Sequence, residues 1–116
     1  MRVAVYRNLN RGCWSIKALE GDTKGRVIAH LDSVSLTNVT AKVSEKARQT
    51  VLLKRVRSVH AWLIGELDEK CIQFEGKKLR YNPYNTNGQF VDVESNMPVE
   101  SASAMYFSAD NNVFYK

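Results

Sequence analysis

The sequence predicts a single α+β domain, a mainly antiparallel β-sheet with one amphipathic helix, at about residues 44–57, packed on one face. Three observations predict this class. The length of 116 residues suits one domain. Short runs that alternate apolar and polar residues, separated by turn formers, fill most of the chain. Only the stretch at about residues 44–57 has apolar residues at helical spacing. The apolar fraction of 44% excludes global disorder.

The N-terminal third predicts four strands. Residues 2–9 and 13–18 alternate on either side of a segment of turn formers, which is a hairpin signal. A turn at 21–25 precedes a short strand at 26–30. Residues 33–43 alternate again, with a break near Thr37 and Asn38, and their polar positions predict one solvent-exposed face.

The predicted helix follows directly. Ser44 is a good N-cap, and Glu45 in the first turn suits the positive end of the helix dipole. No Gly or Pro interrupts residues 44–57. Three apolar residues at helical spacing form the stripe expected to face the core: Ala47, Val51 and Leu52.

The C-terminal half predicts further strands. Residues 58–67 are apolar on both faces, which favours a central strand. Breakers at 82–88 predict a loop. The remaining segments are a hairpin of 71–75 with 78–81 around Gly76, a short strand at 89–93, a strand or short helix at 101–107, and a final strand at 113–115.

The charge is concentrated in one half of the sequence. Residues 1–60 carry a net charge of +8 and residues 61–116 carry −3. Such clustering costs self-repulsion unless the cations are solvated or matched by an anionic partner. One reading is a solvated helix face that opposes the acidic half, and the other is a contact surface for a phosphate backbone or an acidic protein patch. The cations expected to bind are Lys42, Lys46, Arg48, Lys54, Arg55 and Arg57.

A second candidate binding segment lies around the predicted loop. Tyr81 and Tyr84 bracket an Asn-Pro pair and follow three cations, Lys77, Lys78 and Arg80. Aromatic rings interleaved with cations can stack on and clamp a nucleic-acid strand. The alternative is a loop whose tyrosines pack back on the sheet.

Catalytic and metal chemistry have weaker support. His60 could serve a small RNase if a second acid or base, such as His30, lay beside it, although a packed histidine is the simpler reading. Cys13 and Cys71 with these histidines make four potential zinc ligands, but their spacing matches no known site. We therefore expect no catalytic residue, no metal and no cofactor. Two cysteines without a C-x-x-C pair favour a reducing compartment.

Membrane insertion is not expected. The longest uncharged apolar run, residues 59–65, is interrupted by a histidine and falls far short of the ~20 residues that span a bilayer. Arg2 and Arg7 precede any apolar core of the signal-peptide type. We expect neither secretion nor membrane anchoring.

Several short motifs together resemble a known group. They read N-L-x-x-x-C-W-S from Asn8, G-R-V-x-x-H from Gly25, V-S-E-x-x-R from Val43, V-H-A from Val59 and Y-N-P-Y from Tyr81. This order is similar to that of small uncharacterised proteins encoded by tailed bacteriophages and prophages. The chain departs from that pattern where a Gly usually precedes Arg48 and an Asn precedes Val59. The resemblance implies a phage origin and work in the bacterial host cytoplasm, and it implies no activity or ligand.

Three functions remain as expectations. The first is a small non-enzymatic binding protein that modulates or inhibits a host macromolecule, such as a nucleic-acid-handling or antiviral-defence complex, by covering an anionic or nucleic-acid-binding surface. Its partner is a host protein or protein–nucleic-acid complex. The alternative is direct DNA or RNA binding through the basic helix and the Tyr/Lys loop. A second alternative is a small RNase that uses His60. The sequence leaves the oligomeric state open.

Overall fold

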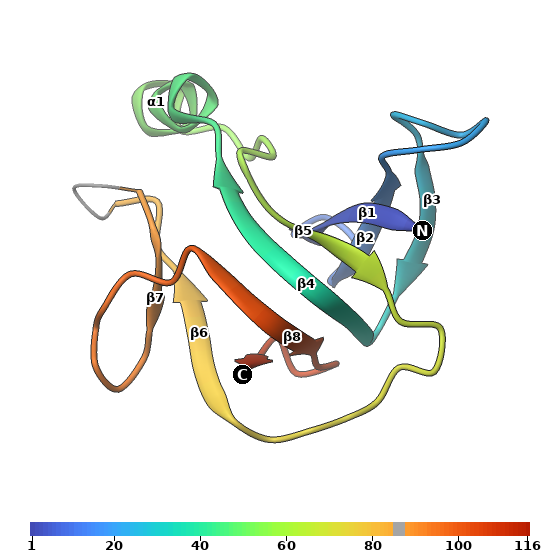
Figure 1. The fold of residues 1–116 in the computed structure, drawn as a ribbon. Helices are drawn as coiled ribbons and strands as arrows, with labels where there is room; N and C mark the ends of the chain where they lie inside the picture. Colours follow the sequence, from blue (N-terminus) through green and yellow to red (C-terminus); the bar gives the residue numbers. More distant parts are fainter. Residues whose placement is uncertain (85–87) are drawn as a thin grey trace.

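Nine strands form one continuous sheet in the computed structural model, which describes residues 1–84 and 88–116 (Figure 1). The strand order is β3-β2-β1-β5-β4-β8-β9-β6-β7, and every neighbouring pair is antiparallel. With its one short helix this confirms the predicted α+β class. The elements are β1 (Arg2–Asn8), β2 (Cys13–Ala18), β3 (Val27–Leu31), β4 (Val34–Val43), α1 (Glu45–Lys54), β5 (Ala61–Leu67), β6 (Lys77–Tyr81), β7 (Phe90–Asp92), β8 (Ser101–Phe107) and β9 (Val113–Tyr115).

The turn between β1 and β2 is closed by Asn8. Its side-chain Oδ1 accepts hydrogen bonds from the backbone N–H groups of Asn10 and Arg11, both at 3.1 Å. Gly12 has a φ of 66° and donates its N–H to the carbonyl oxygen of Asn8 at 2.8 Å. A glycine suits this left-handed position because it has no Cβ to clash. The predicted N-terminal hairpin is therefore confirmed.

The predicted break in the fourth strand is a β-bulge. The register of β4 against β5 shifts between Thr37 and Thr40, and Asn38 takes a φ of 52°. Gly65 of β5 lies against this bulge, where an added Cβ would be 2.7 Å from the carbonyl oxygen of Thr37 and 3.3 Å from Cγ2 of Val39. The bulge can form because residue 65 has no side chain.

The sheet curls so that its two ends share a core. Fully buried side chains of β1, β2, β4 and β8 form its centre, and Leu79 of β6 and Phe90 of β7 pack into the same cluster. The ring of Tyr81, at the end of β6, lies 5.4 Å from the ring of His60, just before β5. Strands far apart in the sheet order therefore meet across the core.

The helix differs from its prediction in length and in packing. It ends at Lys54 rather than at residue 57, because Arg55 adopts a left-handed φ of 55° and caps it by donating its N–H to the carbonyl oxygen of Val51 at 2.9 Å. It continues from the end of β4 and lies beyond the sheet rather than across a face (Figure 1). Its expected apolar stripe is only half-buried, and Arg48 is its one buried residue.

The remaining strand predictions have mixed outcomes. Residues 101–107 are a strand, and β5 is central, between β1 and β4, although it begins at Ala61 rather than at 58. Residues 71–75 have no regular structure, so the predicted hairpin around Gly76 is wrong: β6 pairs instead with β7 and β9. Of the predicted loop 82–88, residues 85–87 lie outside the described residues.

One carboxylate joins the turn after β7 to the last strand. Oδ1 of Asp92 accepts hydrogen bonds from the backbone N–H groups of Glu94 and Ser95 at 2.9 and 2.8 Å, and Oδ2 accepts from the hydroxyl of Tyr115 at 2.5 Å. The bond from the Ser95 N–H is the main cause that lowers the pKa of Asp92 to about 2. Burial, with the bond to Asp92, raises the pKa of Tyr115 to about 12.

We predict that Gly65→Ala destabilises the protein by about 1–3 kcal/mol, the usual cost of overpacking, because the new Cβ meets the bulge backbone. Urea denaturation followed by tryptophan fluorescence measures this. Gly21→Ala is the control for loss of a glycine, since a Cβ added there would have no neighbouring atom within 4 Å, although its φ of 76° adds local strain. The prediction is contradicted if Gly65→Ala unfolds at the same urea concentration as wild type.

We predict that Asp92 stabilises the protein above pH 4 and that this contribution is lost as the pH falls towards 2. The pKa of Asp92 is depressed in the folded state, so the unfolded chain takes up the proton first and stability falls with pH. The difference in free energy of unfolding between wild type and Asp92→Asn should shrink over this range in denaturant titrations. If this difference in free energy of unfolding stays constant from pH 5 to 2, the depressed pKa of Asp92 is contradicted. Glu94→Gln is the control for loss of a carboxylate in the same turn.

Candidate docking surface

Helix α1 is fixed at both ends by its own sequence. The hydroxyl oxygen of Ser44 accepts a hydrogen bond from the N–H of Ala47 at 3.3 Å, which confirms the predicted N-cap. The backbone N–H of Ser44 donates to the carbonyl oxygen of His60 at 2.8 Å, so the helix start is tied to the residue before β5. The helix and the segment that follows it therefore project together from one end of the sheet (Figure 1).

Five of the six cations predicted in residues 42–57 are exposed on the helix, on the segment after it and, for Lys42, at the end of β4. Among residues 1–84 and 88–116, no ion pair involves any of the five exposed members: Lys42, Lys46, Lys54, Arg55 and Arg57. Within the described residues, the one acidic residue of the C-terminal half that forms an ion pair is Glu66, and it pairs with the N-terminal amine at 3.4 Å. We name these five residues the cationic projection.

Arg48 differs from its prediction, because its guanidinium is used inside the protein. The side chain is 5% exposed. Nε and Nη2 donate to the two carboxylate oxygens of Glu45 at 2.9 and 2.6 Å, and Nη1 donates to the carbonyl oxygen of Pro83 at 2.7 Å. Arg48 therefore bonds the helix to the segment after β6 and offers no charge to a partner.

The electrostatics of this pair match its geometry. The hydrogen bonds from Arg48, then from Gln49, lower the pKa of Glu45 to about 2, and the bond to Glu45 raises the pKa of Arg48. Gly88 packs so closely that an added Cβ would lie 2.5 Å from Nε of Arg48. A signal for this role exists in the sequence, since Glu45 and Arg48 are three residues apart and face each other on a helix.

The two predicted stacking tyrosines have different environments. Tyr81 packs inward, with its ring 5.4 Å from His60 and 4.9 Å from Phe90, and burial raises its pKa. This is the alternative reading, in which the tyrosine packs against the sheet. Tyr84 is 80% exposed, and the bond from Arg48 to Pro83 holds its segment beside the helix. The structure thus holds the segment of exposed Tyr84 against helix α1, which carries Lys46 and Lys54.

The cations of β6 are exposed but spread along the strand. Lys77 pairs with Tyr115 of β9, and Nζ of Lys78 lies 5.9 Å above the ring of Phe114, at the end of β6 away from the Pro83 segment. Arg80 is exposed one residue before Tyr81. Arg80 is therefore the nearest of the three, along the chain, to Tyr84 and to Pro83, whose carbonyl oxygen bonds the helix.

The two histidines are not brought together. Nδ1 of His30 bonds the hydroxyl of Ser15 at 2.8 Å, whereas Nδ1 of His60 lies 2.9 Å from the carbonyl oxygen of Ser58. Strand β3, which holds His30, is three steps from β5 in the sheet order, or about 14 Å at the usual strand spacing. A proton-transfer pair needs hydrogen-bond reach, so His30 cannot be the second group of an RNase site with His60.

The four potential zinc ligands also stay apart. Cys13 is a buried free thiol, and Sγ of free Cys71 lies 3.8 Å from the hydroxyl of Ser33. Within the described part of the chain, no group of three or more His, Cys, Asp or Glu side chains could hold a metal ion. The described structure assembles no site from these residues.

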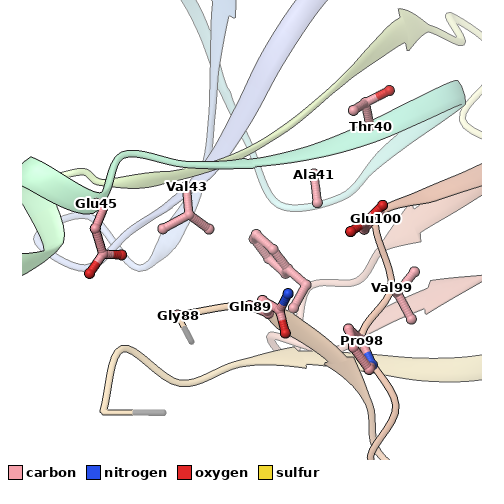
Figure 2. Close-up of a pocket in the computed structure, with 10 residues that line it drawn as sticks. Thr40, Ala41, Val43, Glu45, Gly88, Gln89, Pro98, Val99 and Glu100 are labelled. Atoms are coloured by element: carbon pink, nitrogen blue, oxygen red, sulfur yellow. The ribbon is translucent and has the colours of Figure 1, made fainter. Parts of the chain in front are cut away.

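A hollow of about 360 Å³ separates β4 from the chain around β7 (Figure 2). Figure 2 shows Glu45 and Glu100 at opposite ends of it, with Val43 and Ala41 between them. Its lining contains these two acidic side chains and, among the described residues, no basic one. The hollow is therefore electrostatically distinct from the cationic projection.

Comparison with known proteins identifies the family. Residues 1–116 match the family described as "Mycobacterium phage L5 gene 82 protein". The chain belongs to this phage gene 82 family. It is similar to the "Gene 82 protein" of Mycobacterium phage L5, with 39% identity over 115 residues that cover 93% of this chain and 90% of the relative. This confirms the phage resemblance, while no solved structure matches the chain.

The structure of this gene 82 family member bears on whether a helix could span a membrane. Its helix α1 has 10 residues, and in the described residues no helix is both long and apolar enough to cross a bilayer.

We predict that Arg48→Gln lowers the thermal unfolding midpoint and speeds amide hydrogen exchange in both α1 and Tyr84, because it removes the bonds between helix and segment. Lys46→Gln removes one charge from the exposed side of the same helix and should leave both close to wild type. Differential scanning fluorimetry and hydrogen exchange by mass spectrometry make the measurements. Equal behaviour of the two variants argues against Arg48 as the anchor.

Proposed function

We propose that this protein is a non-enzymatic phage factor that binds a host macromolecule and inhibits or modulates it by covering an anionic or nucleic-acid-binding surface. The observation that carries the proposal is the cationic projection, with five exposed cations that form no ion pair within the described residues. The fixed helix ends support it, because a charged surface held in one shape loses less entropy on docking.

Electrostatics favour this use of the projection. Isolated surface charges contribute little to folding, and a cluster of one sign destabilises the compact state through self-repulsion. The same cluster speeds encounter with an oppositely charged surface and suppresses wrong partners. Arg48 makes the internal bonds of this region, whereas the side-chain charges of the five outer cations form no ion pair within the described residues.

The family membership supports a host partner. A relative is encoded by a mycobacteriophage, so we propose a bacterial host, with mycobacteria as the first source of partners to test. The proposed workplace is the host cytoplasm, where nucleic-acid-handling and antiviral-defence complexes offer anionic surfaces. The phage origin thus supports an inhibitor or modulator of such a complex.

Direct DNA or RNA binding is the second candidate. The 80% exposure of Tyr84 favours it, because an exposed ring beside cations can stack on a base while the cations contact phosphates. Tyr81 does not add a second platform, since its ring is packed against His60 and Phe90. This candidate therefore rests on Tyr84 and on the cationic projection.

We predict that neutralising the projection abolishes capture of the host partner. The test variant combines Lys42→Gln, Lys46→Gln and Lys54→Gln. The matched control combines Lys24→Gln, Arg26→Gln and Lys70→Gln, which removes the same charge from exposed positions elsewhere. Affinity capture from nuclease-treated mycobacterial lysate, with quantitative mass spectrometry, should recover a partner with wild type and control but not with the test variant. Equal recovery by both variants rejects the proposed surface.

Fluorescence anisotropy with labelled DNA and RNA separates the second candidate from the first. Direct binding should weaken steeply as salt rises, and Tyr84→Ala should weaken it further by about 1–3 kcal/mol, the usual value of one stacked base. Tyr84→Phe, which keeps the ring at the same position, is the matched control and should bind as wild type does. Binding that ignores salt, or that ignores Tyr84→Ala, counts against direct recognition.

A further inference from the structure

A small pocket lies where the first hairpin meets the segment between α1 and β5. It has a volume of about 210 Å³, and residues 6–10 and 57–59 line it. This is several times the ~30 Å³ that one water molecule occupies in the liquid, so a small oxyanion fits. The two lining segments are distant in sequence, and the fold alone brings them together.

The pocket contains two arginines and, in the described part of the chain, no acidic side chain. Arg7 comes from β1 and Arg57 from the segment after the helix. Neither forms an ion pair within the described residues. Two unneutralised guanidinium groups that line one small hollow repel each other unless an anion lies between them.

Arg7 gives an independent indication of a missing acceptor. Its Nη1 is buried and has no hydrogen-bond partner among the described residues, while its guanidinium carbon lies 5.1 Å from the centre of the Trp14 ring. A buried N–H without an acceptor is unfavourable, so Arg7 gains free energy if its guanidinium turns towards an anion in the pocket. The contact with Trp14 leaves the polar edge of the guanidinium as the part that can bind an oxyanion.

Two other lining residues, Asn8 and Ser58, have polar groups that are already engaged. Asn8 uses its Oδ1 on two backbone N–H groups and its Nδ2 on the hydroxyl of Ser15 at 3.1 Å, and the carbonyl oxygen of Ser58 lies 2.9 Å from Nδ1 of His60. These bonds hold both walls in place. The two guanidinium groups are thus the charged donors left for a ligand.

We propose that Arg7 and Arg57 form a binding site for a phosphate group. Arginine forks match the oxygens of phosphate in pairs, and both arginines line the same hollow. The inference deepens the proposed function and rests on it for its biological meaning, since it gives the anionic partner a chemistry. No residue of helix α1 lines the site, and it shares only Arg57 with the cationic projection.

The first experiment titrates the ¹⁵N-labelled full chain with inorganic phosphate at constant ionic strength and follows the arginine Nε–Hε signals by NMR. We expect saturable shifts at Arg7 and Arg57. Arg57→Gln, at an exposed position, should weaken binding by about tenfold, the loss usual for one charged hydrogen bond. Lys54→Gln removes an equal charge outside the pocket and should change the affinity by less than about twofold, the scale of an isolated surface charge. Linear shifts without saturation, or equal affinity of the two variants, overturn the site.

Arg7→Lys provides a second variant that keeps a cation near Trp14 and removes the fork. It should also weaken phosphate binding several-fold while its thermal midpoint stays near that of wild type. If it binds phosphate as wild type does, the fork is not used and the proposal fails.

A competition arm identifies the source of the phosphate. If a single-stranded oligonucleotide displaces inorganic phosphate from wild type, the group belongs to a nucleic-acid backbone, and if only a mononucleotide does, it belongs to a small molecule; both support a phosphate site. The variant that combines Lys42→Gln, Lys46→Gln and Lys54→Gln changes no residue of the pocket lining. Loss of host partner with intact phosphate binding in that variant, or the reverse in Arg7→Lys, which lies outside the cationic projection, separates failure of the docking surface from failure of this site.

Discussion

The position of the helix depends on one buried charge. Arg48 is the only buried residue of α1, and its bonds to Glu45 and to the carbonyl oxygen of Pro83 connect the helix to the chain after β6. A buried guanidinium that lost these acceptors would be strongly unfavourable, so the contact defines one geometry. The other cations of this region are exposed, and the bond to Pro83 holds the segment of exposed Tyr84 against the helix. The orientation of the candidate surface therefore depends on an internal ion pair.

The curl of the sheet makes that bond possible. Gly65 allows the bulge in β4 to approach β5, and bulges increase the local twist of a strand. With this curvature, β6 and β7 reach the same core as β4 and β8. The first hairpin and the segment after the helix also meet, and there Arg7 and Arg57 line one pocket.

The sequence predicted correctly those features that neighbouring residues determine. The hairpin at Asn8 and Gly12, the Ser44 cap and the break near Asn38 all follow from turn and capping residues, and all are present. The prediction at 71–75 was wrong because alternation alone does not supply a partner strand, and β6 pairs with β7 and β9 instead. Arg48, Tyr81 and the Arg7–Arg57 pocket depend on contacts between distant segments, which periodicity cannot show. Sequence therefore located the basic region but could not separate its internal cation from its outer ones.

The strand order also bears on how fast the chain reaches this structure. Strand β1 pairs with β5, and β4 pairs with β8, so each ladder joins segments separated by tens of residues. Closing such long loops costs entropy before any contact compensates it, and sheets rich in distant pairings fold in milliseconds to seconds rather than microseconds. The local β1–β2 hairpin is the natural first element to form. A phage protein of this topology needs its strands through β9 to be synthesised before the sheet can close, since β6 must pair with β9.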